Sequence, residues 1–184
     1  MNNLRELTKD AHTNAERQEF VKILFSGTIN PKLYAAYLKN QHPMYELLEV
    51  CAMAKGVLNG LPDIRRAPSI NADFRELWVE SDGEPTILPV VKRYTDYIMS
   101  IRDDPEKLMA HIYVRHMGDL AGGQMIAKKV PGSGRMYQFE DPDGLKTAIR
   151  ERISDDMADE AKICFQFATE FFKEMMELVE YTDE

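Results

Sequence analysis

Apolar side chains recur at intervals of three and four residues along most of the chain, which is the spacing of one face of a helix. Leu4, Leu7, Ala11 and Ala15 form such a stripe near the start. Alternation with a period of two, which is typical of strands, is scarcely visible. The pattern therefore predicts an all-α fold in which several helices pack into a single domain over residues 1–184.

Cap residues followed by proline divide this pattern into helices. Asn30-Pro31, Asp104-Pro105 and Asp141-Pro142 each combine a side chain that accepts a backbone hydrogen bond with a residue suited to the first turn. The expected segments are a helix at 4–15, a short one ending at Gly27, one from Pro31 towards Asn59 that bends or breaks near Pro43, a loop at 60–69, a helix from Asn71 to Trp78, one after Pro85, and a last helix from Ser154 to about Tyr181.

Composition and charge exclude several classes of protein. The 184 residues are 44% hydrophobic, which suffices for a core, and no apolar run is long enough to span a membrane. The net charge of −8 resides in residues 151–184, with three Lys or Arg against eleven Asp or Glu, so no basic footprint indicates nucleic acid. Cys51 and Cys164 lack CxxC spacing and the N-terminus is polar, which favours a cytoplasmic protein.

Among the four histidines, His12 is the best candidate for a metal ligand. Glu16 follows one turn later, and a carboxylate at that spacing can hold the second nitrogen of a metal-bound imidazole. His111 and His116 are five residues apart, which does not suit a shared metal on one helix face, and His42 stands next to Pro43. A lone helical histidine is nevertheless most often a packing or surface residue.

Two cations beside His12 make a more specific hypothesis. Arg5 and Lys9 lie seven and three residues upstream on the same predicted helix. A single axial imidazole could hold an iron ion, while the cations meet anionic groups on the organic carrier of that iron. Haem is a carrier of this kind.

The stretch RHMGDLAGGQM, residues 115–125, weakens a predicted helix three times. Each glycine in a helix interior costs roughly 1 kcal/mol relative to alanine, but glycine also lets a backbone approach a flat ligand closely. Gly118, Gly122 and Gly123 could therefore lie against a porphyrin, although such spacing also allows two helices to pack tightly. Asp119 among them could organise water that donates a proton to bound O2.

Segments over nearly the whole chain together resemble a known family. They are LTKDAHTNAE, EFVKILFSG, NQHPMYELLE, YVRHMGDLAGGQM, LKTAIR and DEAKICFQFATEFFKEM. The chain resembles haem oxygenase, in particular its soluble bacterial and cyanobacterial branch. This resemblance implies a multi-helix fold that holds haem between a proximal helix and a kinked distal helix.

The resemblance also implies roles for particular residues. His12 would be the proximal iron ligand, tuned by Glu16, and Asp119 would anchor distal water beside the glycines. The other matching positions are Tyr45 and Arg115 in the distal network, Arg5, Lys9, Tyr113, Lys146 and Arg150 at the haem propionates, and Phe165 and Phe172 at the pocket wall or in the ordinary core.

The implied activity is oxidative cleavage of haem b, both cofactor and substrate, to biliverdin, CO and Fe2+. This activity requires O2 and electrons. The electrons would have to come from an external donor, because the sequence has no flavin or nicotinamide fingerprint and no cluster cysteines. The family suggests reduced ferredoxin as donor and a downstream bilin reductase as a further partner, with no membrane or nucleic-acid partner. Local basic side chains would have to dock an acidic donor, and the candidates are Lys9, Arg17, Lys22, Lys39, Lys128 and Lys129.

The chain departs from the family pattern at several positions. Ala168 stands where many relatives carry an asparagine of the distal network, and Val114 replaces a more usual threonine. His116 occupies a position that is more often aromatic, and Arg5 replaces a lysine. The distal network could therefore be wired differently in this chain.

Three alternatives stay open at this point. A haem carrier of the same fold would bind haem without turnover. A helical thiaminase-like enzyme would need a nucleophilic cysteine, and neither Cys51 nor Cys164 has an evident partner in the sequence. A helical interaction protein would use all these motifs for packing.

Overall fold

The computed structural model describes residues 2–182, with side chains for residues 2–179, and this part of the chain contains helices but no strand. The all-α prediction is therefore confirmed. The α-helices are α1 (Leu4–Leu7), α2 (Lys9–Glu16), α3 (Glu19–Phe25), α4 (Pro31–Ala54), α5 (Ala67–Leu77), α6 (Pro89–Ser100), α7 (Pro105–Ala127), α8 (Pro142–Arg150) and α9 (Ala158–Thr182), with 3-10 turns η1 (Glu80–Asp82), η2 (Arg135–Tyr137) and η3 (Asp155–Met157).

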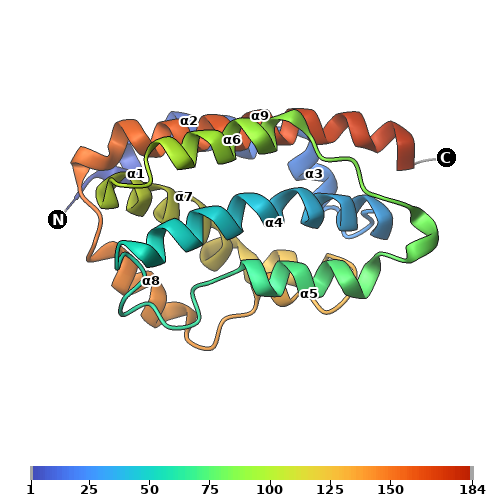
Figure 1. Ribbon diagram of the computed structural model, residues 1–184, viewed down its shortest axis with the longest axis horizontal. Coiled ribbons are helices and arrows are strands. Elements are labelled where there is room, and N and C mark those ends of the chain that lie inside the picture. The colour runs from blue at the N-terminus through green and yellow to red at the C-terminus, as the bar shows by residue number, and fades with distance from the viewer. Residues whose placement is uncertain (1, 183–184) are drawn as a thin grey trace.

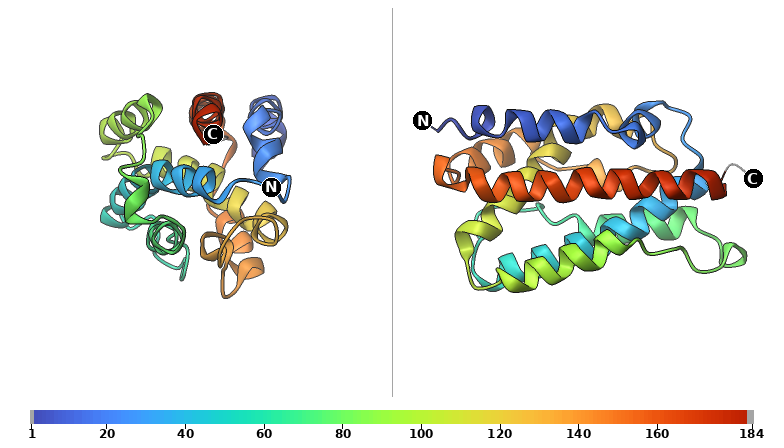
Figure 2. Two further views of the ribbon diagram at one scale, coloured as in Figure 1. Left: turned by 90° about the vertical axis from the view of Figure 1, so that its right-hand side faces the viewer. Right: turned by 90° about the horizontal axis from the view of Figure 1, so that it is seen from above.

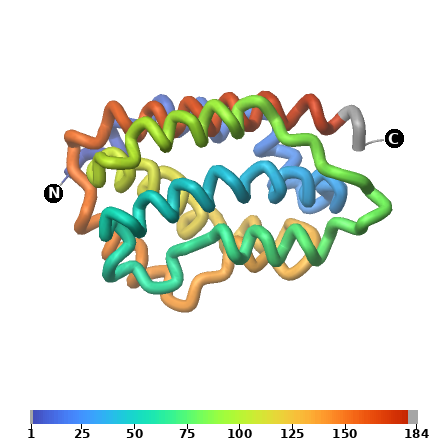
Figure 3. Tube along the Cα trace, in the orientation of Figure 1, coloured from blue at the N-terminus to red at the C-terminus, as the bar shows by residue number. Residues whose placement is uncertain are grey.

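The helices form three layers (Figures 1 and 2). Seen along the long axis, α6, α9 and α2 lie in one row, α4 and α7 lie beneath them, and α5 and α8 lie below these. Helix α4 contacts α5, α6, α7 and α9, so it lies at the centre of one core. The tube in Figure 3 shows the N-terminal end of the chain near η3, which precedes α9, and there the Asn3 amide donates to Asp155 Oδ1 at 2.6 Å. No helix in the described part is long and apolar enough to cross a membrane.

The three cap-and-proline starts are confirmed. Asn30 Oδ1 accepts from the Lys32 amide at 2.8 Å, and the carboxylates of Asp104 and Asp141 accept at their own helix starts in the same way. The last helix begins near its expected position, because η3 and α9 follow Ser154 directly.

Other expected boundaries are wrong. Helix α4 continues through Pro43, which rules out the break but not the bend expected there, and it ends at Ala54 rather than near Asn59, just before Gly56 adopts a left-handed φ of 73°. The first stripe is divided at Thr8, whose Oγ1 donates to the Leu4 carbonyl at 2.8 Å. Helix α6 starts at the second proline, Pro89, rather than after Pro85.

The start of α5 differs for a long-range reason. The helix begins at Ala67, so Asn71 lies inside it and does not cap it. The buried Glu49 carboxylate on α4 accepts from the amides of Arg66 at 2.6 Å and Ala67 at 3.1 Å. A cap supplied from another helix satisfies the first free amides, and a local sequence pattern cannot reveal it.

Candidate functional site

His12 on α2 has the environment of an axial ligand. Its side chain is 45% exposed, its Nε2 lies 2.7 Å from Glu16 Oε1, and its ring stacks on Phe165 of α9 with centroids 5.1 Å apart. Glu16 therefore holds one ring nitrogen, while Nδ1 makes no hydrogen bond within the described residues. An imidazole held by a carboxylate at one nitrogen and open at the other suits a metal ligand.

Helix α7 runs across the three glycines without interruption, and two of them leave one side of it bare. A Cβ at Gly118 would meet nothing within 4 Å, and one at Gly122 would meet only the Ile126 side chain at 3.8 Å. Ala121 and Met125 continue this exposed face at helical spacing. The result is an open strip that a flat apolar ligand could approach closely.

Gly123 lies against a neighbouring segment rather than on the open strip. A Cβ there would lie 3.1 Å from Tyr137 Cβ, so this glycine allows η2 to pack tightly on α7. Of the three glycines expected to face a porphyrin, only Gly118 and Gly122 lie on the open strip, and their role stays a prediction. Phe172 likewise packs on Phe20 and Phe171, which favours the core interpretation, whereas Phe165 contacts His12.

Asp119, on the same helix as the glycines, is a nearly fully buried carboxylate. Tyr45 of α4 donates its hydroxyl to Asp119 Oδ2 at 2.7 Å. Burial raises the pKa of Asp119 to about 6, although His116, the Tyr45 hydrogen bond, Arg66 and Arg115 each act to lower it. A carboxyl group with such a pKa can carry or release a proton near neutral pH.

Arg115 is also buried, and it begins a series of hydrogen-bonded side chains that ends at Glu160. Its Nε donates to the Tyr94 hydroxyl at 2.9 Å, and that hydroxyl lies 2.8 Å from His111 Nδ1. His111 Nε2 in turn lies 3.0 Å from Glu160 Oε1. Ala168, which stands where many relatives carry an asparagine, is half buried and has no polar side chain to join this series. The Tyr94 hydroxyl pairs with His111 instead. Sequence reasoning missed Tyr94 and Glu160, although the i,i+4 spacing of His111 and Arg115 could have suggested a shared face.

Cys164 has neighbours that the sequence did not reveal. It is fully buried, and burial acts to raise its pKa, but His111, Arg115 and Tyr94 outweigh burial and lower it. The expectation that this cysteine lacks a partner is therefore wrong. Its complete burial still denies any substrate access to the thiol, so the thiaminase-like alternative gains nothing.

The cations expected at the propionates lie on three elements. Burial raises the pKa of Tyr113 on α7, while the charges of Arg5 on α1 and Arg150 on α8 act to lower it. Lys146 is one turn before Arg150. Arg5, Lys9, Lys146 and Arg150 make no ion pair with any side chain described in the structure, which leaves them available to an external anion.

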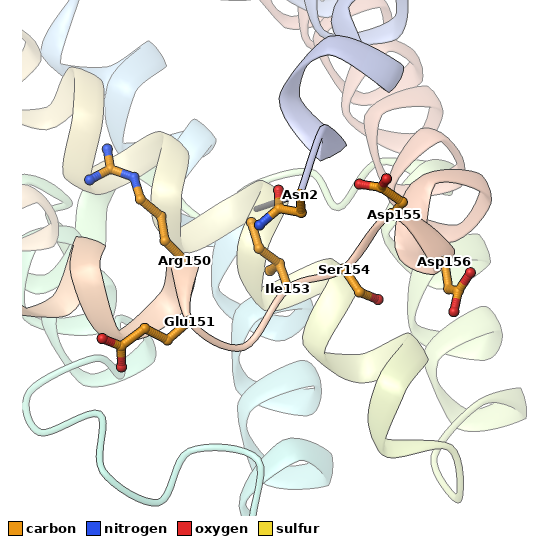
Figure 4. A pocket seen from close by; sticks show the side chains of 7 residues that line it. All are labelled: Asn2, Arg150, Glu151, Ile153, Ser154, Asp155 and Asp156. Carbon is orange, nitrogen blue, oxygen red and sulfur yellow. The ribbon is translucent and has the colours of Figure 1, made fainter.

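Arg150 also borders a polar hollow of about 450 Å³ at the junction of α8, η3 and the N-terminal segment (Figure 4). Its guanidinium points away from the carboxylates of Asp155 and Asp156. The other lining residues are Asn2, Glu151, Ile153 and Ser154. The acidic lining does not suit an apolar macrocycle, so only Arg150 links this hollow to the expected ligand.

These features fit haem. The imidazole of His12 could bind an iron ion, the open strip at Gly118 and Gly122 leaves room for a flat ring, and the cations without an ion pair among the described side chains could meet two carboxylates. No group of three His, Cys, Asp or Glu in the described part of the chain could hold a bare metal ion.

Comparison with known proteins gives the family. The model of the family described as "Heme oxygenase" matches residues 1–180. The chain belongs to the haem oxygenase family. Haem oxygenase of Pyropia yezoensis is 31% identical, over 84% of this chain and 67% of its own length. Haem oxygenase 1 of Synechocystis is 30% identical, over 86% and 73%. Haem oxygenase 2 of Macaca fascicularis is 29% identical, and the chain spans 64% of its length.

Solved haem oxygenase structures share the fold. Haem oxygenase-1 from Synechocystis in complex with haem superposes with a TM-score of 0.80 at 26% identity, over 97% of this chain and 94% of that one. The haem oxygenase from Leptospira interrogans gives a TM-score of 0.73 at 26% identity, over 93% and 97%. The family and the fold implied by the sequence motifs are therefore confirmed, while the roles of individual residues stay predictions.

Proposed function

We propose that this haem oxygenase family member binds haem b through His12 and cleaves it, with O2 and external electrons, to biliverdin, CO and Fe2+. Membership of the family supports the reaction class. The observation that carries the proposal is the pairing, on α7, of a bare glycine strip with the buried carboxyl group of Asp119, whose pKa burial raises to about 6. A carrier would need the strip but not the carboxyl group.

The protein's own residues supply orientation, exclusion of water and proton control. Haem, when bound, supplies the redox chemistry and is also the substrate. His12 would bind the iron, and Glu16 would fix the direction of the imidazole ring. Gly118 and Gly122 would bring the backbone of α7 close to the ring. Asp119 Oδ2, which accepts from Tyr45, would hold or release a proton on this distal side.

Arg5, Lys9, Lys146 and Arg150 would bind the two propionates and so set the rotation of the ring in its plane. Arginine can grip a carboxylate through two parallel hydrogen bonds. Tyr113, whose pKa the charges of Arg5 and Arg150 act to lower, could donate its hydroxyl to a propionate as well.

Aerobic turnover tests the proposal directly. The haem complex should lose its Soret absorption when a reductant and O2 are supplied, and chromatography should identify biliverdin. Asp119→Ala should still bind haem but form little biliverdin. Persistent haem absorption in the wild type, with haem still bound, would instead support the carrier alternative.

His12→Ala tests the iron ligand. The variant should fold, because the His12 side chain is half exposed. Its haem complex should lose the absorption features of imidazole ligation and regain them when imidazole is added to the solution. An unchanged spectrum of iron coordination in the variant would contradict the assignment of His12.

We propose reduced ferredoxin as the electron donor and a bilin reductase as the consumer of the product. Most of the basic side chains expected for docking are exposed, on α2, α3 and the end of α7, while Lys39 is half buried over Phe74 with Nζ 5.1 Å from the ring. Ferredoxin binding should weaken as salt rises, since exposed charges are screened. Calorimetric affinities that stay constant from low to high salt would contradict this docking mode. The cytoplasmic location also stays a prediction; Cys51 and Cys164 are both free.

A further inference from the structure

His116 occupies a position that is more often aromatic in the family, and the structure gives this histidine a specific environment. Its side chain is fully buried, with Nε2 2.8 Å from Oε2 of the equally buried Glu49. Its ring contacts the Tyr45 ring edge-on, with centroids 5.3 Å apart, and Tyr45 is the residue that donates to Asp119. His116 precedes Asp119 by three residues on α7, which places the two side chains on neighbouring positions of one face.

The partner of His116 is a carboxylate whose pKa is lowered. Burial alone would raise the pKa of Glu49, but hydrogen bonds from His116 and from the Arg66 and Ala67 amides outweigh burial and lower it. An ionised Glu49 accepts a hydrogen bond, so His116 Nε2 carries the proton. Nδ1 is buried and has no hydrogen-bond partner in the described part of the chain. A proton gained by the ring would therefore go to Nδ1 and create a cation beside Asp119.

We propose that His116 is a positioning residue for Asp119, an imidazole anchored on Glu49 that stabilises the ionised form of the distal carboxylate. The consequence for catalysis depends on the proposed function. The electrostatic link itself does not, because it exists in the protein without haem.

Other charged and titratable groups also face Asp119, and the test has to separate His116 from them. Among the groups that oppose the effect of burial on the Asp119 pKa, His116 is the largest, followed by Tyr45, Arg66 and Arg115. The further neighbours are three buried tyrosines, Tyr34 and Tyr37 on α4 and Tyr137 on η2. His116 is distinguished by its place on the helix of Asp119, its edge-on contact with the Tyr45 ring and its hydrogen bond to Glu49.

The experiment titrates Asp119 in the haem-free protein by 13C NMR of carboxyl-labelled aspartate, with the signal assigned from Asp119→Asn. His116→Gln should raise the midpoint of Asp119 by about one pH unit, since an opposite charge at short range has an effect of this size. His116→Tyr, which keeps an aromatic edge against Tyr45, should raise it similarly and serves if the glutamine variant does not fold.

His111→Gln is the matched control. His111 is the other buried histidine of α7, and it too is paired with a glutamate, Glu160 at 3.0 Å. It is not among the groups that act on Asp119, so this variant should leave the Asp119 midpoint unchanged. In the haem complex, the acid limb of the pH profile of turnover should shift upward in His116→Gln by the same amount.

An Asp119 midpoint equal in wild type, His116→Gln and His116→Tyr would overturn the proposal, even if the wild type cleaves haem. An equal rise in His111→Gln would also overturn it, because the effect would then not be specific to His116. If the NMR shift occurs but no haem is cleaved, the proposed function fails while this inference stands.

Discussion

At Asp119, burial in the fold raises the pKa of the carboxyl group, while neighbouring polar groups lower it. The carboxyl group is buried beside Arg115 and Tyr45, and burial still dominates its pKa. The sequence could identify this aspartate, because it lies among glycines in a recognisable motif. It could not reveal the proton affinity, because burial and two groups distant in sequence, Tyr45 and Arg66, act on the pKa together with His116 and Arg115.

This proton affinity predicts how Asp119 affects stability with pH. The pKa is about 6 in the folded protein and 3.8 ordinarily, so between these values the folded protein binds more protons than the unfolded chain. The contribution of protonated Asp119 to the stability of the folded protein is complete below pH 3.8 and is lost as the pH rises through 6. Two pH units at 1.36 kcal/mol each give roughly 3 kcal/mol.

Asp119→Asn should therefore be more stable than wild type at pH 7, by up to about 3 kcal/mol, and this advantage should shrink towards pH 4. Urea unfolding at several pH values measures the difference. A difference that does not vary with pH would contradict the raised pKa.

At the scale of the element, α7 contains two kinds of glycine that the sequence does not distinguish. Gly118 faces open space, and Gly123 lies against Tyr137. The helix period places residues on faces, but which face meets a neighbour depends on η2, an irregular segment with little sequence signal. The same limit explains the misplaced start of α5, where the capping Glu49 is 17 residues from Arg66.

Alanine substitutions at these two positions should have opposite effects on folding. Gly118→Ala should stabilise the haem-free protein by about 0.5–1 kcal/mol, because alanine favours the helix and its Cβ meets nothing. Gly123→Ala should destabilise it by about 1–3 kcal/mol through overpacking against Tyr137.

Haem titration separates the two roles further. Gly118→Ala should weaken haem binding despite its gain in stability, since the new methyl group enters the strip that the ring would occupy. Thermal unfolding and haem affinity measured on both variants give the comparison. Equal haem affinity in wild type and Gly118→Ala would contradict a porphyrin-facing strip.

At the scale of the whole molecule, Arg66 joins segments that are far apart in the chain. Its guanidinium is almost fully buried, donates to the carbonyls of Met136 at 3.1 Å and Gln138 at 2.8 Å, and lies 3.8 Å from the centroid of the Phe139 ring. It thereby fixes the segment after α7 to the start of α5. The sequence offered only a loop with two arginines here.

Arg66→Ala should destabilise the protein by at least about 3 kcal/mol, because several buried carbonyls lose their donor together. Arg65→Ala is the control. Arg65 is half exposed and pairs with Glu46 at 3.0 Å and Glu49 at 3.3 Å, so its loss should cost about 1 kcal/mol. Denaturant midpoints measure both, and equal losses would contradict the structural role of Arg66.

The sequence was sufficient for the fold class, the family and the local pair His12–Glu16. It was insufficient for the contacts between distant segments, such as His116 with Glu49 or His111 with Glu160, which lie 67 and 49 positions apart. Helix periodicity predicts that these side chains are buried, but not which of them meet.

Tyr137, which packs against Gly123, belongs to a segment that hydrogen bonds to α5 hold in place. Asp73 on α5 accepts from the amides of Arg135 at 3.0 Å and Met136 at 2.8 Å. The connection between α7 and α8 is consequently held against both α5 and α7. Changing its length by even one residue should disturb the packing of Tyr137 against Gly123, so this loop should tolerate insertions poorly.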